Sequence, residues 1–204
     1  MLNVLLFKAS RKILEHCFIP LFSPYAKILL YLNGANVGKG LDVKGFIKVI
    51  VTRRGKLQIG KNLHINSGNN FNIIGRQQKN TFWIEGILTI GNNVGMSSSA
   101  IICKYIINIG DNVTIGGNTV IYDTDFHSLN PLDRQNKTHD KLNAKKLPVI
   151  IQNNVFIGAH TTILKGVTIG ENSIIGACSL VSKSIPANEI WAGNPAIFLK
   201  KLNE

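Results

Sequence analysis

The stretch that decides the fold is IQNNVFIGAHTTILKGVTIGENSIIGACSLVSKSI, residues 151–185. An aliphatic residue recurs at every sixth position along it: Ile151, Ile157, Ile163, Ile169, Ile175 and Val181. Four residues after each of these comes a small or β-branched residue: Val155, Thr161, Val167, Ser173, Ser179 and Ile185. Because a repeat at a fixed period outranks local propensity as a fold signal, this stretch predicts consecutive copies of one structural unit.

The same period continues upstream, with interruptions. Its inward positions there are expected at Val37, Val43 and Val49 with Leu41 and Ile47, at Ile59, Ile65 and Phe71, at Ile90, Met96 and Ile102 with Val94, Ala100 and Ile106, and at Ile109, Ile115 and Ile121 with Val113 and Thr119. The pattern predicts that each six-residue unit forms a short strand followed by a tight corner. Gly, Asn and Asp between the units suit such corners, because they tolerate unusual backbone angles.

Three units of this kind close one triangular coil, and successive coils stack with parallel hydrogen bonds. No unit buries its apolar face alone, so the stack is expected to fold as one body. The residues therefore predict an all-β fold, a parallel β-helix over residues 34–185. They do not give the handedness of its coils, and the general rule for crossovers favours right-handed connections.

Three segments depart from the period. Residues 1–33 are expected to be helical and broken by Pro20 and Pro24. Three roles stay open for that segment: an amphipathic element at a membrane surface, a helical cap on the first coil, or a contact between subunits. Residues 123–148 are polar and predict an extruded functional loop, and residues 186–204 predict a cap on the open end of the stack.

The charge of the chain limits the chemical classes of partner that it is expected to bind. A formal net charge of +12 and a pI near 9.8 favour an anionic partner. Nucleic acid is not expected, because there is no arginine-rich arm, aromatic-basic interleaving or zinc-finger spacing. Phosphorylated cofactors, anionic glycans and acidic membrane surfaces remain as candidates.

The cysteines and the first residues indicate a compartment. Cys17, Cys103 and Cys178 form no disulfide framework, which favours a reducing compartment. The first residues lack the pattern of a signal peptide, and the apolar run from Val4 to Phe7 is too short to span a bilayer. We therefore expect a cytoplasmic protein, with peripheral contact at the inner membrane face as a further possibility.

The stretch VFIGAHTTILKGVTIGENSIIGACSLVSKSIPANEIWAGNPA, residues 155–196, resembles the hexapeptide-repeat acetyltransferases. It is most similar to the sugar O-acetyltransferase branch, which includes maltose and galactoside acetyltransferases and members of capsule and exopolysaccharide synthesis. DTDFHSL at 123–129 matches the catalytic loop of that family. The resemblance implies left-handed coils, a homotrimer with active sites between subunits, and acetyl-CoA as cosubstrate without a metal. It also implies a saccharide hydroxyl as the acceptor.

The resemblance further implies that His127 is the general base. This assignment agrees with the chemistry, because an alcohol must lose its proton as it attacks a thioester and imidazole titrates near neutrality. Asp123 and Asp125 are close enough in sequence to hold the imidazole tautomer. A backbone carbonyl is the alternative, and the sequence does not choose between them.

The cofactor groove implied by the resemblance consists of Phe156, Gly158, Ala159, Ala177, Ser182, Lys183, Lys200 and Lys201. Ala159 stands where relatives contact the oxyanion, and without a hydroxyl only its backbone N–H is available. The lysines match basic positions near the CoA phosphates. Ser98 stands where relatives place an asparagine against the acceptor sugar, and this departure leaves the acceptor open.

Other functions compete with this hypothesis. Within acyl transfer, the acceptor is alternatively serine, an antibiotic or an amino sugar. A γ-type carbonic anhydrase shares the coil but needs three histidines around a metal, and the spacing of His127 and His160 does not match. A non-enzymatic scaffold is the last alternative, although the loop histidine and the basic tail argue against it.

Overall fold

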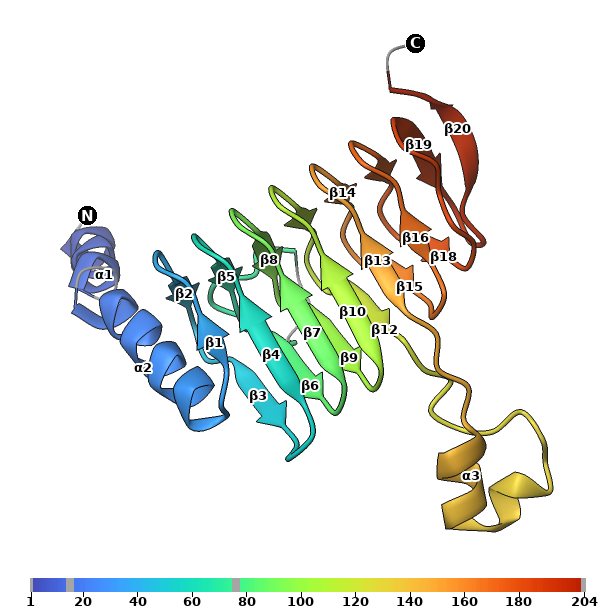
Figure 1. The fold of residues 1–204 in the computed structure, drawn as a ribbon. Helices are drawn as coiled ribbons and strands as arrows, with labels where there is room; N and C mark the ends of the chain where they lie inside the picture. The colour runs from blue at the N-terminus through green and yellow to red at the C-terminus, as the bar shows by residue number, and fades with distance from the viewer. Residues whose placement is uncertain (1, 14–16, 75–77, 203–204) are drawn as a thin grey trace.

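A computed structural model describes residues 2–13, 17–74 and 78–202 of the chain. It shows a left-handed parallel β-helix, a triangular prism of three mostly parallel sheets (Figure 1). Two helices lie at its N-terminal end, a hairpin closes its C-terminal end, and one long loop protrudes from its side (Figure 1). The all-β fold predicted from the repeat is confirmed.

Each sheet takes one strand from every coil. Sheet A is made of β1 (Asn36–Val37), β4 (Lys56–Ile59), β7 (Ile87–Ile90), β10 (Ile106–Ile109), β13 (Val149–Ile151) and β16 (Thr168–Ile169). Sheet B is made of β2 (Asp42–Lys44), β5 (His64–Asn66), β8 (Gly95–Ser97), β11 (Thr114–Ile115), β14 (Phe156–Ile157), β17 (Ile174–Ile175), β19 (Glu189–Ala192) and β20 (Ile197–Lys201). Sheet C is made of β3 (Lys48–Val51), β6 (Thr81–Ile84), β9 (Ala100–Cys103), β12 (Val120–Tyr122), β15 (Thr162–Ile163) and β18 (Leu180–Val181).

Because the chain visits sheets A, B and C in turn, each edge of the prism is a column of stacked corners. The A–B edge includes the corners at residues 60–63, 91–94, 110–113, 152–155 and 170–173. The B–C edge includes those at 116–119, 158–161 and 176–179. The C–A edge includes those at 52–55, 85–86, 104–105, 164–167 and 182–184, and the protruding loop leaves from it.

The six-residue period correctly identifies the core of the C-terminal coils. The aliphatic side chains at 151, 157, 163, 169, 175 and 181 are no more than 1 % exposed. The small residues four positions later are also buried and fill the space beside them. Removal of these side chains from water is the main force that stacks the coils, because each coil covers the apolar interior of the next.

The register predicted around residue 100 is wrong by one position. The period places Ala100, Ile102 and Ile106 inside, but all three are only half-buried. The inward side chains are those of their neighbours: Ile101, Cys103 and Ile107. The corner after Met96 is one residue shorter than the period requires, and a slip of one residue turns every side chain of a strand to its other face.

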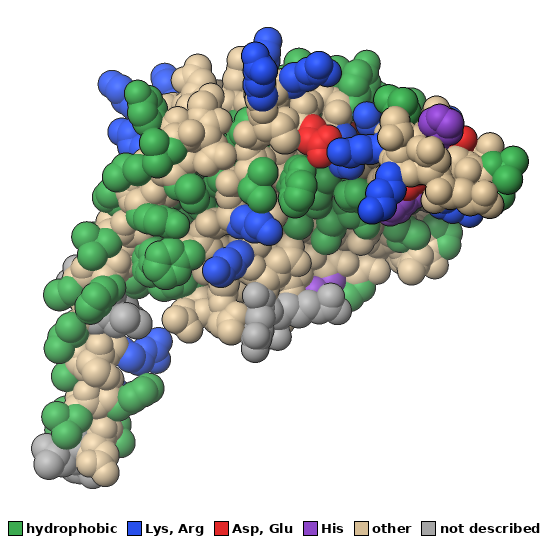
Figure 2. Space-filling model, turned by 90° about the horizontal axis from the view of Figure 1, so that it is seen from below, with side chains coloured by type: hydrophobic (Ala, Val, Ile, Leu, Met, Phe, Trp, Pro, Cys, Tyr) green, Lys and Arg blue, Asp and Glu red, His purple; other side chains and the backbone are tan. Residues whose placement is uncertain are grey.

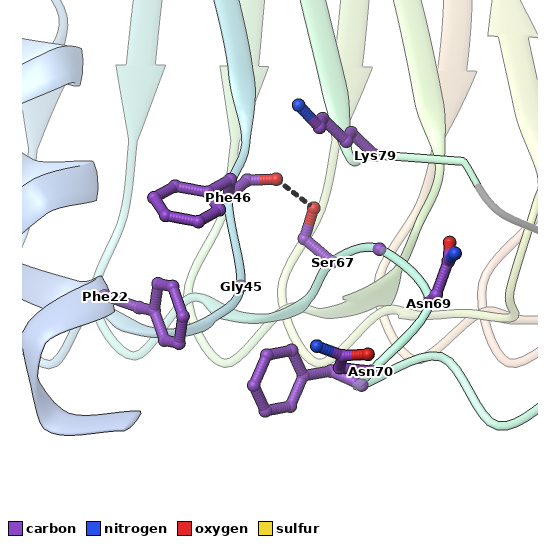
Figure 3. Close-up of a pocket in the computed structure, with 9 residues that line it drawn as sticks. Phe22, Gly45, Phe46, Ser67, Asn69, Asn70 and Lys79 are labelled. Carbon is purple, nitrogen blue, oxygen red and sulfur yellow. Dashed lines mark hydrogen bonds between the residues drawn. The ribbon is translucent and has the colours of Figure 1, made fainter. Parts of the chain in front are cut away.

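Residues 68–74 and 78–80 leave the coil between β5 and β6, so Phe71 is not in the core as predicted. Its ring lies 5.5 Å from that of Phe22 in the second helix, and Phe22 lies 5.1 Å from Phe46. The three rings border a cleft of about 280 Å³ (Figure 3). There the Ser67 hydroxyl donates a hydrogen bond to the Phe46 carbonyl. This insertion interrupts the period without interrupting the stack.

The N-terminal segment is helical, as predicted. Helix α1 spans Leu2–Ile13 and helix α2 spans Ile19–Leu32, and residues 14–16 between them lie outside the described part of the chain. Helix α2 buries Ala26 and Leu30 against the first coil and contains both Pro20 and Pro24, so the breaks predicted at these two prolines are wrong. Pro20 lies in the first turn of the helix, where its missing N–H would have no partner within the helix, whereas Pro24 removes one hydrogen bond from the helix interior. No helix among the described residues is long and apolar enough to cross a membrane.

The C-terminal segment caps the stack with strands. Strand β19 pairs parallel with β17 and so adds to sheet B, and β20 folds back antiparallel on β19.

The protruding loop, residues 123–148, contains a 3₁₀ turn (Asp133–Gln135) and helix α3 (Lys137–Asn143). The loop is therefore an ordered lobe that stands away from the coil (Figure 1).

Candidate active site

The loop that carries His127 is anchored at its base as a short antiparallel ribbon. The Leu147 N–H donates to the Asp123 carbonyl at 3.0 Å, and the Asp125 N–H donates to the Lys145 carbonyl at 3.0 Å. Next to the histidine, Phe126 adopts a left-handed conformation with φ of +65°, which is rare for a bulky residue. This strained turn, one residue before His127, fixes the direction in which the loop continues.

The imidazole of His127 is held by a carboxylate from helix α3. Its Nδ1 lies 2.7 Å from Oδ2 of Asp140, while Oδ1 of Asp140 accepts the Ser128 N–H at 2.8 Å. The hydrogen bond from His127 and that from the Ser128 backbone lower the pKa of Asp140 below its usual value. Because an ionised carboxylate only accepts hydrogen bonds, Nδ1 carries the proton and Nε2 presents a lone pair. The side chain is 69 % exposed, so Nε2 is open to an incoming hydroxyl.

The structure gives the two aspartates predicted to orient the imidazole other partners. Asp123 is fully buried, and its carboxylate accepts the backbone N–H of Lys104 at 2.8 Å and of Tyr105 at 2.7 Å. Asp125 forms an ion pair with Lys165, with 2.6 Å between Oδ1 and Nζ. The group on Nδ1 is Asp140 instead of Asp123, Asp125 or a backbone carbonyl. Asp140 lies 13 residues from His127 in the chain and is brought near only because the loop folds into α3.

A second feature lies on the B–C edge, where two predicted cofactor residues leave their backbone amides free. Within the described part of the chain, the N–H groups of Ala159 and Ala177 have no acceptor. Their corners stack so closely that a Cβ on Gly158 would lie 2.5 Å from the Ala177 nitrogen. Phe156, on strand β14, is exposed beside this column. The edge therefore offers unpaired donors next to an aromatic ring.

The backbone N–H groups at the equivalent corner positions of the A–B edge, in contrast, have hydrogen-bond acceptors. There, the amide at the equivalent corner position is satisfied by a side chain of the neighbouring coil. The Asn92 N–H donates to Oδ1 of Asp111 at 2.6 Å, and the Asp111 N–H donates to Oδ1 of Asn153 at 2.9 Å. Ala159 and Ala177 have no such neighbour, because the residues stacked on them have no side-chain acceptor.

The remaining predicted cofactor residues are exposed but do not share this edge. Ser182 and Lys183 lie at the C–A edge, and Lys200 and Lys201 lie on β20 of the terminal hairpin. His127 also belongs to the C–A edge through its loop. Sheet C separates the two edges, so a single chain does not bring His127 together with Ala159 and Ala177.

Ser98, predicted to meet the acceptor, instead closes a corner of the coil. It is fully buried, with φ of +44°, and its hydroxyl accepts the Gly68 N–H at 3.1 Å. The insertion that begins at Gly68 contacts this position, which the sequence did not reveal. The structure therefore gives Ser98 a role in closing the fold and no surface toward a ligand of this chain.

Among the described residues outside the loop, His64 also contacts a carboxylate, with 2.7 Å between its Nδ1 and Oδ2 of Asp42, and the cysteines form no reactive cluster. Burial, and then the charge of Asp123, raise the pKa of the Cys103 thiol, which therefore stays protonated. Nδ1 of His160 is buried at a corner of the B–C edge without a hydrogen-bond partner among the described residues. Those residues also contain no group of three His, Cys, Asp or Glu side chains placed to hold a metal ion.

Sequence comparison relates the chain to hexapeptide-repeat proteins. Residues 148–183 match the family described as bacterial transferase hexapeptide (six repeats). The galactoside O-acetyltransferase of Escherichia coli (strain K12) is 38 % identical over 104 residues, which cover 51 % of this chain and 48 % of the relative. That of Lactococcus lactis subsp. lactis (strain IL1403) is 39 % identical over 97 residues, 47 % of this chain and 44 % of the relative. The match thus spans about half the length of these curated relatives.

Solved structures extend the likeness to nearly the whole fold. A galactoside acetyltransferase in complex with coenzyme A is 26 % identical, with a TM-score of 0.55 over 92 % of this chain and 84 % of that chain. AntD, an N-acyltransferase from Bacillus cereus, has a TM-score of 0.64 over 86 % of this chain and 87 % of its own, but at 22 % identity it shows the fold alone. The resemblance stated from residues 155–196 is confirmed.

Proposed function

We propose that this chain, which resembles the hexapeptide-repeat acetyltransferases in sequence and fold, transfers an acetyl group from acetyl-CoA to a hydroxyl of a saccharide. The observation that carries the proposal is the imidazole of His127, held at Nδ1 by Asp140 with Nε2 open. This is the arrangement that a general base needs, because one nitrogen is oriented and the other remains free to accept a proton.

His127 performs two proton transfers in this mechanism. Its Nε2 removes the proton of the sugar hydroxyl as the oxygen attacks the thioester carbonyl. The Ala159 N–H, which has no partner among the described residues, donates to the oxyanion of the tetrahedral intermediate. When that intermediate collapses, the C–S bond breaks and the imidazolium returns the proton to the CoA sulfur. The Asp140 carboxylate stabilises the imidazolium between the two steps.

The separation of the two features supports a closed homotrimer. His127 extends from the C–A edge, whereas Ala159 and Ala177 lie on the B–C edge of the same chain. A three-fold interface joins two different surfaces of the same chain, and in the proposed trimer these are the C–A edge of one subunit and the B–C edge of the next. Each active site then takes its base from one subunit and its free amides from the neighbour.

The groove on the B–C edge suits an extended thiol arm. Phe156 offers an exposed ring, Gly158 keeps the coils close, and Ala177 offers its unpaired N–H to an amide carbonyl of the arm. Ser182 lies on the C–A edge, so in the proposed trimer the neighbouring subunit brings it beside this groove, toward the phosphate end of the arm. Lys183, Lys200 and Lys201 supply positive charge for the phosphates.

Calorimetric titration with acetyl-CoA tests the proposed function. We expect saturable binding, and about tenfold weaker binding of dephospho-CoA, because the missing phosphate removes a charge-assisted contact with the lysines. The double variant Lys183→Ala/Lys200→Ala should lose most of this preference. A matched double variant on the A–B edge, Lys39→Ala/Lys61→Ala, should keep it. A folded sample that does not bind acetyl-CoA would contradict the proposal.

We further place the reaction at the cytoplasmic face of a membrane, in surface polysaccharide synthesis. Helices α1 and α2 carry exposed apolar side chains along their length, including Leu5, Phe7, Leu21 and Ile28 (Figure 2). Their described residues include four cations and no acidic residue: Lys8, Arg11, Lys12 and Lys27. An apolar surface with this charge suits an interface of anionic lipids.

Sedimentation with vesicles tests this location. The protein should bind vesicles that contain anionic phosphatidylglycerol and bind zwitterionic phosphatidylcholine vesicles more weakly. Leu5→Asp/Phe7→Asp should reduce binding about tenfold or more, because charged side chains do not enter the interface. The control Ile73→Asp changes an exposed isoleucine on an inserted loop and should have no effect. Unchanged vesicle binding by the helix variant, or its loss of oligomers instead, would contradict the location.

A further inference from the structure

A basic cleft that no role assigned so far explains lies between the protruding loop and the coil. Its volume is about 430 Å³. Lys104 and Glu85 line it from the C–A edge, and Lys137 and Lys141 line it from helix α3. Lys146, at the base of the loop, completes the charged wall. Four ammonium groups therefore face one carboxylate.

The cations of the cleft are largely uncompensated. The one carboxylate, Glu85, lies 4.0 Å from the Lys104 ammonium and also accepts the indole N–H of Trp83. Across the described residues, Lys137, Lys141 and Lys146 have no carboxylate within ion-pair distance. Lys137 and Lys141 lie one turn apart on the same helix, where like charges repel. An anion in the cleft would relieve this repulsion.

The cleft adjoins the proposed general base. Helix α3 carries Lys137 and Lys141, and the same helix carries Asp140, which holds His127. On the coil side, the Lys104 ammonium lies 5.5 Å from the ring centre of Phe126, which directly precedes His127. His127 does not itself line the cleft, but a ligand bound there would contact lysines that adjoin Asp140 and Phe126, the neighbours of the proposed base.

The positive charge continues along the C–A edge away from the C-terminus. The corner with Arg53 and Arg54 stacks on that of Glu85 through the Thr52 N–H, which donates to the Ile84 carbonyl at 2.9 Å. The Glu85 N–H in turn donates to the Cys103 carbonyl at 2.7 Å, one residue before Lys104. Figure 2, which views the molecule from below, shows Lys and Arg side chains where the protruding lobe meets the body. This track suits an extended molecule with several negative charges.

The cleft is separate from the lysines proposed for CoA. Lys183 lies on the C–A edge on the C-terminal side of the loop, and Lys200 and Lys201 lie on the terminal hairpin. Lys104 and Glu85 belong to coils on the N-terminal side of the loop. The cofactor and a ligand of the cleft would therefore approach the loop from opposite sides, as a donor and an acceptor must.

We propose that the cleft binds a negatively charged group of the acceptor, and hence that the acceptor is an acidic saccharide. This inference rests on the proposed acyl transfer, because it assigns the acceptor of that reaction. The shared chemistry is an anionic oxygen, of a carboxylate or of a phosphate, bound by lysine ammonium groups through charge-assisted hydrogen bonds. The apolar part of the cleft, from Leu142 and Ala144, suits the face of a sugar ring.

Equilibrium titration of the full chain at saturating CoA tests this assignment, since the lysines near the cofactor are then occupied. The probes are tetragalacturonate, uncharged galactotetraose and uridine diphosphate. We expect a charged probe to bind at least tenfold more tightly than galactotetraose, about 1.4 kcal/mol. A preference for tetragalacturonate assigns a carboxylate, and a preference for uridine diphosphate assigns a phosphate.

Matched charge reversals locate the binding. Lys137→Glu/Lys141→Glu should weaken the charged probe about tenfold or more, because two attractive contacts become repulsive. Lys39→Glu/Lys61→Glu makes the same change in net charge on the A–B edge and should have little effect. Circular dichroism checks that both variants are folded.

The outcomes separate this inference from the proposed function. Normal acetyl-CoA binding with equal affinity for charged and uncharged probes would overturn the acidic acceptor alone. Equal losses in the two charge-reversal variants would do the same, because they would reflect net charge and not the cleft. Failure to bind CoA or acetyl-CoA would overturn the proposed function and, with it, the assignment of an acceptor.

Discussion

Replacement of His127 with Ala is expected to lower kcat about 10²- to 10⁴-fold, the usual contribution of a general base. The affinity for acetyl-CoA should remain nearly unchanged, because in the proposed site the amides of the B–C edge and the lysines hold the cofactor, and His127 does not. Steady-state kinetics and calorimetric titration of the same preparation measure the two quantities. The loss would therefore appear in turnover and not in binding.

His139→Ala is the matched control for this prediction. His139 lies in the same loop, is exposed, and follows the cap of helix α3, where its backbone N–H bonds to Asn136. Its imidazole has no carboxylate hydrogen bond comparable to that of His127 among the described residues. Normal turnover by His127→Ala, or equal losses in the two variants, would show that the base is another group.

Replacement of Asp140 with Asn is expected to lower kcat about 10²-fold while the protein stays folded. An amide can donate to Nδ1, which favours the tautomer with the proton on Nε2 and blocks the base. The carboxylate should hold the imidazole throughout the neutral range. Because the pKa of Asp140 is lowered in the folded state, the interaction is present above the ordinary carboxyl pKa and is lost only as the pH falls through the lowered value. Turnover of the variant and of the parent, measured across the neutral pH range, checks the expected loss in kcat and the constant role of the carboxylate.

Asp123→Asn is the matched control, and its expected defect is in stability. The buried carboxylate accepts two backbone N–H groups, and an amide offers a single acceptor oxygen in its place. One buried donor is then left unpaired, which costs about 1–3 kcal/mol of unfolding free energy. Urea denaturation measures this loss. If Asp123→Asn lowered kcat without loss of stability, Asp140 would not be the group that orients the base.

The sequence by itself determined the architecture. A strand turns alternate side chains to opposite faces, and a corner of constant length returns the chain to the same orientation, so a six-residue period identifies the inward residues directly. This held for the coils from Ile151 to Val181. It failed after Met96, where the corner is one residue short, and at Phe71, which belongs to an insertion. In both places an aliphatic or aromatic residue still stands six positions from the last one, so the count continues although the chain no longer follows it.

For the site, the loop motif identified His127, but only the tertiary structure identified its partner. Asp140 comes into contact because the loop folds into helix α3, which the Asn136 side chain caps and which the sequence did not predict. The sequence likewise singled out Ala159 and Ala177, but the structure shows why they matter: no side chain of a neighbouring coil accepts their N–H groups. A repeat encodes which residues face inward, because that depends on spacing along the chain. Which groups meet across coils and loops depends on stacking, and only the folded molecule decides that.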